Sequence, residues 1–343
     1  MKIYPICSES LGVRSFCIKI KTPDCSILLD PGCALGPYKK LKIPHRLEFE
    51  KLQYFTSQII EMSTDCEYLF ISHYHHDHFK PKLEDTMYIQ SNQKLFESLY
   101  TNKTVFCKQY QNKTNYNQKQ RGVKLYKDLS SLVKRKIRIG VDTFTNNWSI
   151  YQRKCSIEVQ AEIVDSAMIG DTHLLFPREF SHGMRFDGKD IFVQPIIIGY
   201  HDEFMYFFPD VQGVPSPTDC ELILNLRREI EQVHTIYISK NPSTHIIALG
   251  GPITYLLRSQ NLLHLLNQTL EHSQAIVQSF DLAIIDHHLL RDPIFLKYWE
   301  GFQNNKKNII LFNPDLIEEI QKEEELGIPV VEFNRERLYQ QYP

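Results

Sequence analysis

Short apolar runs separated by turn-forming residues dominate the first part of the chain. Runs at 16–20 and 26–29 flank the turn Thr22-Pro23-Asp24, a pattern that predicts a β-hairpin. Residues 46–62 carry apolar side chains at helical spacing and predict an amphipathic helix. The apolar run at 68–71 then predicts a buried strand. Strand, helix and strand in this order are typical of an α/β fold.

Later parts of the chain continue this alternation of strands and helices. The helix predicted at 255–271 has leucines along one side, and Pro209 interrupts the strand predicted at 205–210. No apolar run approaches the roughly 20 residues that a membrane helix needs, so no membrane association is expected. The further predicted elements are strands at 157–164 and 282–286, a polar loop at 109–120 and an acidic helix at 315–326.

Composition favours one globular domain. The chain has 343 residues, of which 42% are hydrophobic, and this is enough to bury a substantial core. Its eight cysteines are scattered and no two form a C-x-x-C pair, which argues against a cysteine zinc site. The start lacks a signal-peptide pattern, so we expect reduced thiols and a cytoplasmic location. We expect a single domain over 1–343, with a helical C-terminal extension at about 293–343.

The net charge of −2 hides an uneven distribution of charge. Residues 94–138 hold twelve basic residues, opposed only by Glu97 and Asp128, and tyrosines lie between the charges. We interpret this segment as a basic insert on an acidic body. A solvated surface explains it about as well as an anion-binding surface does. The second interpretation would give it phosphate or nucleic acid as a partner.

The segment directly after the strand at 68–71 carries the strongest chemical signal. It reads H-x-H-x-D-H, with His73, His75, Asp77 and His78 as its metal-binding types. Side chains alternate along an extended stretch, so the first two histidines point the same way. Imidazole and carboxylate at this density suit zinc, manganese or iron. We therefore predict a metal site at the end of this strand.

Later residues that also end a strand or lie at a glycine turn are candidates to complete the site. His182 precedes Gly183, Asp210 follows the interrupted strand, and His287 and His288 follow the strand at 282–286. In the H-x-H-x-D-H segment, one polar residue, Ser72, separates the end of the strand from the first ligand, His73. Asp286 stands in that place before His287, which favours His287 as the ligand. His288 would then face the pocket as an acid or substrate contact.

These residues, taken in order, resemble the motifs of the metallo-β-lactamase superfamily over about residues 1–290. Asp30, in Leu29-Asp30-Pro31-Gly32, matches the first motif, and the H-x-H-x-D-H segment matches the second. The third, fourth and fifth motifs are matched by His182, Asp210 and His287.

A closer resemblance is to a largely archaeal subgroup of that superfamily, whose members are predicted metal-dependent hydrolases. It is carried by Ser72-His73-Tyr74-His75, Asp210-Val211-Gln212-Gly213, Gly250-Gly251-Pro252-Ile253-Thr254-Tyr255-Leu256 and Asp286-His287-His288-Leu289-Leu290-Arg291-Asp292. This resemblance implies no particular substrate.

The superfamily resemblance implies a four-layer αβ/βα sandwich with two divalent metal ions between the sheet edges. We expect zinc, with manganese or iron as alternatives. Asp30 and Asp286 are expected to support ligands rather than bind metal themselves. The implied ligands are His73, His75 and His182 for the first ion, Asp77, His78 and His287 for the second, and Asp210 between both.

The implied activity is hydrolysis by a hydroxide that bridges the two ions, with Asp77 orienting the water. The substrate is expected to be anionic, with a phosphodiester, lactone or thioester as the bond that is cleaved. Arg185, Lys80 and Gly251 are candidate substrate contacts. Two alternatives remain open: a nucleic-acid processing nuclease that uses residues 94–138, and an iron-dependent redox enzyme of the same fold.

Overall fold

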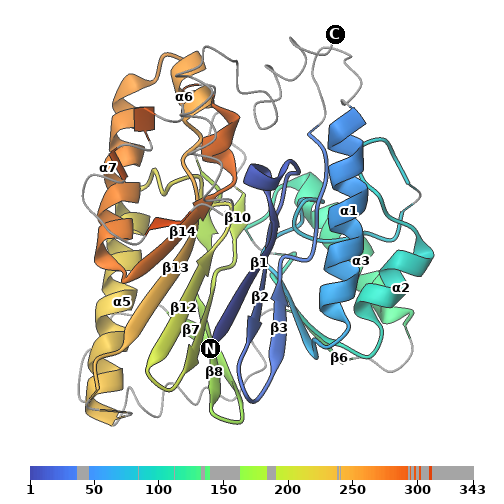
Figure 1. The fold of residues 1–343 in the computed structure, drawn as a ribbon, viewed down its shortest axis with the longest axis horizontal. Helices are drawn as coiled ribbons and strands as arrows, with labels where there is room; N and C mark the ends of the chain where they lie inside the picture. The colour runs from blue at the N-terminus through green and yellow to red at the C-terminus, as the bar shows by residue number, and fades with distance from the viewer. Residues whose placement is uncertain are drawn as a thin grey trace.

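The fold contains two β-sheets that pack face to face (Figure 1). The computed structural model describes residues 1–36, 46–83, 85–111, 113–132, 136–139, 163–183, 191–237, 239, 241–292 and a few positions between 294 and 310. The first sheet has the order β1-β2-β3-β4-β5-β6 and the second β15-β14-β13-β12-β11-β8-β7. A separate short pair joins β9 and β10.

The first sheet begins as antiparallel hairpins and continues as parallel strands. β1 to β3 pair antiparallel, and β3 to β6 pair parallel. Parallel neighbours need a crossover, and helices supply it here. The strands are β1 (Lys2–Ser8), β2 (Phe16–Lys21), β3 (Ser26–Leu29), β4 (Tyr68–Ile71), β5 (Thr104–Cys107) and β6 (Lys136–Ile139), and the helices are α1 (Arg46–Ser63), α2 (Gln93–Tyr100) and α3 (Tyr116–Ser130).

The second sheet has the same arrangement, antiparallel first along the chain and parallel afterwards. β7, β8, β11 and β12 pair antiparallel, and β12 to β15 pair parallel. Its strands are β7 (Ile163–Ile169), β8 (Thr172–Pro177), β11 (Ile196–Tyr200), β12 (Glu203–Phe208), β13 (Thr244–Gly250), β14 (Leu282–Asp286) and β15 (Ile309–Ile310), and its helices are α5 (Pro217–Tyr237), α6 (Thr254–Ser259) and α7 (Leu263–Ser279). The short elements are β9 (Phe180–Ser181), β10 (Phe192–Val193) and the 3-10 turns Glu9–Leu11 and His288–Arg291.

Three apolar cores hold these layers together. The central core lies between the sheets, where the rings of Phe16 and Phe207 stack with centroids 5.6 Å apart. One outer core packs the first sheet against α1, α2 and α3, and the other packs the second sheet against α5 and α7. Figure 1 shows the helices on the two outer faces. The expected four-layer αβ/βα sandwich is therefore confirmed.

The clearest apolar patterns gave the right elements. The hairpin around 22–24, the helix at 46–62 and the strands at 68–71 and 282–286 all appear close to their predicted bounds. The single helix predicted at 255–271 is wrong, because α6 and α7 are separate. Asn261 lies between them with a φ of 56°, a left-handed conformation that interrupts a helix.

The basic segment at 94–138 is not an insert. Its residues form most of α2 and β6 and all of β5 and α3, and these elements complete the parallel half of the first sheet. The polar stretch at 109–120, predicted as loop, contributes its last residues to α3. Charge alone misled the prediction, because a solvated helix on the outside of a sheet can be as basic as an appended loop.

Several predictions fall outside the described residues. These are most of the strand at 157–164, the acidic helix at 315–326, Arg185 and most of the extension at 293–343. Among the described helices, none is long and apolar enough to cross a bilayer.

Candidate metal centre

Asp30 fixes the start of the histidine-rich loop. It ends β3 with a φ of 44°, and β3 pairs parallel with β4, so Asp30 lies beside the end of β4. Its Oδ1 accepts the Ser72 N–H (2.7 Å), and its Oδ2 accepts the Ser72 hydroxyl (2.6 Å). The same Oδ2 lies 2.7 Å from Nδ1 of His78. One buried carboxylate therefore joins the two ends of the loop and turns Nε2 of His78 away from itself.

Helix α3 holds the middle of the same loop through Tyr74. The Tyr74 N–H donates to Oε1 of Gln118 (2.6 Å), and Arg121 donates to the Tyr74 carbonyl oxygen (3.3 Å). Gly122 lets the helix approach, because a Cβ there would lie 2.9 Å from the Tyr74 ring. These three positions share one helix face. Sequence reasoning missed them, since polar residues on a basic helix predict exposure to solvent.

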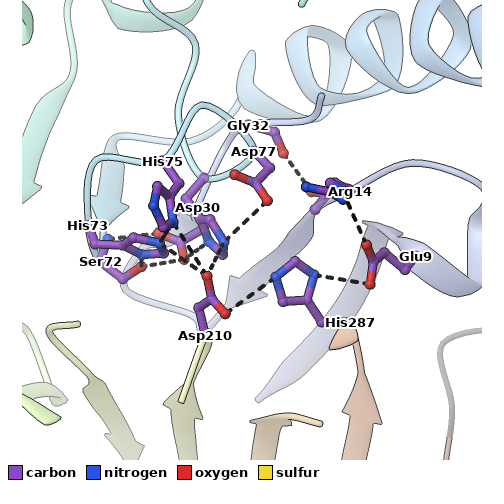
Figure 2. A network of polar contacts seen from close by, with 12 residues as sticks. Glu9, Arg14, Asp30, Gly32, Ser72, His73, His75, Asp77, Asp210 and His287 are labelled. Carbon is purple, nitrogen blue, oxygen red and sulfur yellow. Dashed lines mark hydrogen bonds and ion pairs between the residues drawn. The ribbon is translucent and has the colours of Figure 1, made fainter. Parts of the chain in front are cut away.

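The other candidates reach the same place from the second sheet and from the short β9–β10 pair. His182 follows β9, Asp210 follows β12, and His287 follows β14. β12, β13 and β14 run parallel, so Asp210 and His287 lie at the same sheet edge. Loops beyond the carboxyl ends of parallel strands commonly form α/β binding sites. Figure 2 shows Asp210 and His287 facing His73 and His75 from the first sheet.

The first ligand group consists of His73, His75, His182 and Asp210, whose ligand atoms lie within 4.8 Å of one another. Nδ1 of His75 is 2.9 Å from Nε2 of His73 and 3.2 Å from Nε2 of His182. Nε2 of His182 lies 2.5 Å from Oδ2 of Asp210. Ligands of tetrahedral zinc, with bonds near 2.0–2.1 Å, are about 3.3 Å apart. The spacing of these nitrogens therefore suits one small divalent ion.

The second ligand group consists of Asp77, His78 and His287. Nε2 of His78 lies 4.0 Å from Oδ2 of Asp77 and 3.6 Å from Oδ2 of Asp210. Nε2 of His78 and both ring nitrogens of His287 are buried without a hydrogen-bond partner among the described residues. Buried polar atoms are usually satisfied, so such orphaned nitrogens at one point indicate a missing ligand. A divalent ion fits that requirement.

Asp210 connects the two groups. Its Oδ2 faces His73, His75 and His182, and its Oδ1 lies 3.7 Å from Nε2 of His287. Burial raises the pKa of Asp210, but the facing His182 and His288 imidazoles outweigh this and hold that pKa well below its usual value. The carboxylate is therefore ionised and available to both groups.

Two imidazoles of the first group, those of His73 and His75, are also in the protonation state that a metal needs. Burial, together with the neighbouring His78, lowers the pKa of His73 well below its usual value. Burial likewise lowers the pKa of His75. Both rings are therefore neutral near pH 7, and a neutral imidazole offers a free lone pair to a divalent ion.

The residues after β14 have different surroundings from those expected. His287 adopts a φ of 76°, which is strained for a residue with a side chain. His288 was expected to face the pocket; its side chain is 5% exposed, its Nε2 hydrogen-bonds Oδ1 of Asp210, and with Asp210 and His287 it forms a further group that could hold a metal ion. Asp286 was expected to support a ligand; among the described residues it accepts from Ser8, from Ser10 and from the backbone N–H of His287. Asp286 therefore fixes the backbone of the segment that carries His287.

Two of the candidate substrate contacts do not suit that role. Lys80 is fully buried, and its Nζ donates to the backbone oxygens of Cys33 and Gln90 and to the hydroxyl of Thr56. The Gly251 N–H donates to the carbonyl oxygen of Asp286 (2.7 Å), so it is not available to a substrate. Arg185 lies outside the described residues.

Lys80 is expected instead to stabilise the fold. Lys80→Met keeps most of the side-chain volume but leaves buried acceptors at Cys33, Thr56 and Gln90 without their donor. We expect the free energy of unfolding to fall by about 3 kcal/mol, measured by urea denaturation. Lys82→Met, at a partly exposed position in the same loop, is the control. Equal midpoints for both variants would contradict this role.

Comparison with solved structures gives only distant similarity. The isothiocyanate hydrolase from Delia radicum gut bacteria has a TM-score of 0.41 at 9% identity, covering 93% of this chain and 92% of that chain. A metallo-β-lactamase fold protein from Bacillus subtilis has a TM-score of 0.41 at 9% identity, with 87% and 88% coverage. Similarity of this degree carries no argument about the chemistry of the site.

Sequence comparison gives a clearer result. No family model matches the chain. The UPF0282 protein of Korarchaeum cryptofilum is 27% identical over 100% of this chain and 96% of its own length. The UPF0282 protein of Methanocaldococcus jannaschii is 30% identical, covering 86% of each chain. These relatives confirm the expected similarity to an archaeal group, and the chain therefore belongs to the UPF0282 family.

Proposed function

We propose that the protein is a metal-dependent hydrolase with two divalent ions, zinc being the first choice. The observation that carries this proposal is the position of Asp210, whose carboxylate lies between the two groups of ligand atoms, with Oδ2 near His182 and His78 and Oδ1 near His287. Histidine-rich donor sets with a shared carboxylate suit zinc, although manganese and iron accept the same ligands. Asp77 is the second carboxylate of the centre.

Bound in pairs, divalent ions lower the pKa of a water ligand and polarise the bond to be cleaved. The residues of the chain then have distinct tasks. Asp77 is 15% exposed, and neighbouring imidazoles hold its pKa below the usual value although burial raises it. As an ionised carboxylate near solvent, Asp77 can accept a hydrogen bond from the attacking water and orient it. His288 holds Asp210 in place through its Nε2.

The proposed substrate is small and anionic, and Arg121 is the residue that favours this. Much of the basic charge at 94–138 serves the fold: Lys103 binds backbone oxygens and Lys108 pairs with Glu179. Arg121 differs, because it is partly buried and the contact described for it is the neutral Tyr74 carbonyl oxygen. A guanidinium beside the loop at 72–78, which feels the charge of Asp77 but has no carboxylate within 4 Å among the described residues, favours binding of a carboxylate or phosphate group.

Arg121→Gln is expected to raise KM for an anionic substrate about tenfold or more, because a charged hydrogen bond contributes about 1.5–3 kcal/mol. The KM for a neutral analogue should change little. Steady-state kinetics on a matched pair of substrates measures both. The control is Lys119→Gln on the exposed face of the same helix. An equal loss for both substrates would show that Arg121 only supports the loop.

The direct test is metal analysis followed by activity screening. The protein is loaded with zinc, manganese or iron and assayed against phosphodiesters, lactones and thioesters. Hydrolysis that follows metal content supports the proposal. Iron after anaerobic purification, with oxygen consumption, would favour the redox alternative. Cleavage of RNA that weakens steeply with salt would favour the nuclease. A chain that binds no divalent ion would overturn all three.

A further inference from the structure

The two histidines of the second ligand group have unequal support from elsewhere in the chain. Nδ1 of His78 donates to Oδ2 of Asp30 (2.7 Å), which leaves Nε2 directed toward the centre. A metal-binding histidine usually donates its other ring N–H to a carboxylate or carbonyl group, which fixes its tautomer. His287 needs the same kind of partner. The neighbouring carboxylate in the same motif, Asp286, is not that partner, because it accepts from Ser8, from Ser10 and from the backbone N–H of His287.

The structure places His287 between two carboxylates. Its Nε2 lies 3.7 Å from Oδ1 of Asp210, and its Nδ1 lies 3.8 Å from Oε2 of Glu9. Figure 2 shows the three side chains in a row, with Glu9 on the side away from the first ligand group. His287 is fully buried, so water does not satisfy its nitrogens. The order of carboxylate, imidazole and ligand cluster is the same as for Asp30 and His78, although Glu9 lies 3.8 Å from Nδ1 of His287 and Asp30 lies 2.7 Å from Nδ1 of His78.

Glu9 is itself held in place by its surroundings. It lies in the 3-10 turn Glu9–Leu11, directly after β1. The residues on either side, Ser8 and Ser10, both donate to the buried carboxylate of Asp286. Nε of Arg14 lies 3.8 Å from Oε1 of Glu9, on the carboxylate oxygen that does not face His287. The side chain of Glu9 is only 10% exposed, so its charge acts in poorly solvated surroundings.

We propose that Glu9 is a positioning residue for His287: it receives the Nδ1–H, so that Nε2 is the free lone pair offered to the second ion. This inference rests on the proposed two-ion centre. The carboxylate makes the ring a stronger donor and selects the tautomer, and it also holds a strained backbone residue in one orientation. Asp286 connects the two parts, because it binds Ser8, Ser10 and the His287 N–H together.

Cobalt titration of the full-length protein in competition with a chelator tests this inference. Glu9→Gln keeps the shape of the side chain and removes its charge. We expect the affinity for the second ion to fall about 10- to 100-fold, with the first ion bound as before. Glu9→Asp, which retains the charge, should recover part of that affinity. Glu97→Gln, an exposed position on α2, is the neutral control.

A spectroscopic readout separates positioning from a structural role. In the cobalt-loaded protein, the exchangeable N–H protons of ligand imidazoles give strongly shifted NMR signals. Glu9→Gln should move one of these signals and leave the melting temperature of the metal-free protein unchanged. Unchanged affinity and signals would overturn the inference. So would loss of both ions with a lower melting temperature. A wild-type chain that binds no second ion would instead overturn the two-ion proposal itself.

Discussion

Replacement of Asp210 by asparagine is expected to release both metal ions and to abolish turnover. Oδ2 faces the first ligand group and also lies 3.6 Å from His78, and Oδ1 faces His287, so the change removes a ligand from both groups at once. An amide retains the size of the side chain but lacks the negative charge that balances two divalent ions. Metal content after dialysis, measured by mass spectrometry alongside activity, gives the result directly.

The matched control is Asp202→Asn. Asp202 is also a carboxylate hydrogen-bonded to an imidazole, that of His234 (2.9 Å), but it lies between β11 and β12 at the opposite end of the second sheet. Its replacement should leave metal content and activity close to those of the wild type. Retention of two ions by Asp210→Asn would exclude Asp210 as the residue shared by the two groups.

His75→Ala is expected to empty the first ligand group and to reduce activity to background. His75 is the central member of that group, since its Nδ1 lies within 3.2 Å of both His73 and His182. Without it, the remaining imidazoles and Asp210 provide one ligand fewer than a tetrahedral zinc site needs. The fold should persist, because the side chain is partly exposed and lies in a loop.

The adjacent histidine provides the control for this prediction. His76 belongs to none of the ligand groups, and its ring instead contacts that of Phe79 at a centroid distance of 5.5 Å. His76→Ala should keep the full metal content. If the two alanine variants lost metal equally, the loop would be acting through its general histidine content rather than through the H-x-H-x-D-H spacing.

Much of the centre was predictable because its residues obey a local rule. In His73, Asp210 and His287, a ligand type stands within two residues after the end of an apolar strand, and parallel strands bring such positions to the same edge of each sheet. The alternation of these strands with helices along the chain likewise predicts the layers of sheet and helix. A short-range pattern of apolar and polar residues was therefore sufficient where the chemistry lies next to a strand end.

The supporting residues were not predictable in this way. Glu9 is a single acidic residue in a turn, and its role depends on Asp286, which is 277 positions away along the chain. Lys80 reads as a surface lysine, but burial beside Cys33 and Thr56 makes it part of the interior. Arg121 reads as part of a basic stretch. In each case the role depends on contacts with residues far away along the chain. No local pattern in a single sequence identifies such contacts.

The stacking of Phe16 on Phe207 between the sheets has a mechanical consequence. The first half of the molecule contributes four of the proposed ligands and the second half three. A hinge motion between the halves would pull these ligands apart while also opening the aromatic contacts beneath them. We therefore expect entry and departure of small molecules to rely on movement of side chains and loops above the ions rather than on a hinge between the halves, because the halves share one apolar core.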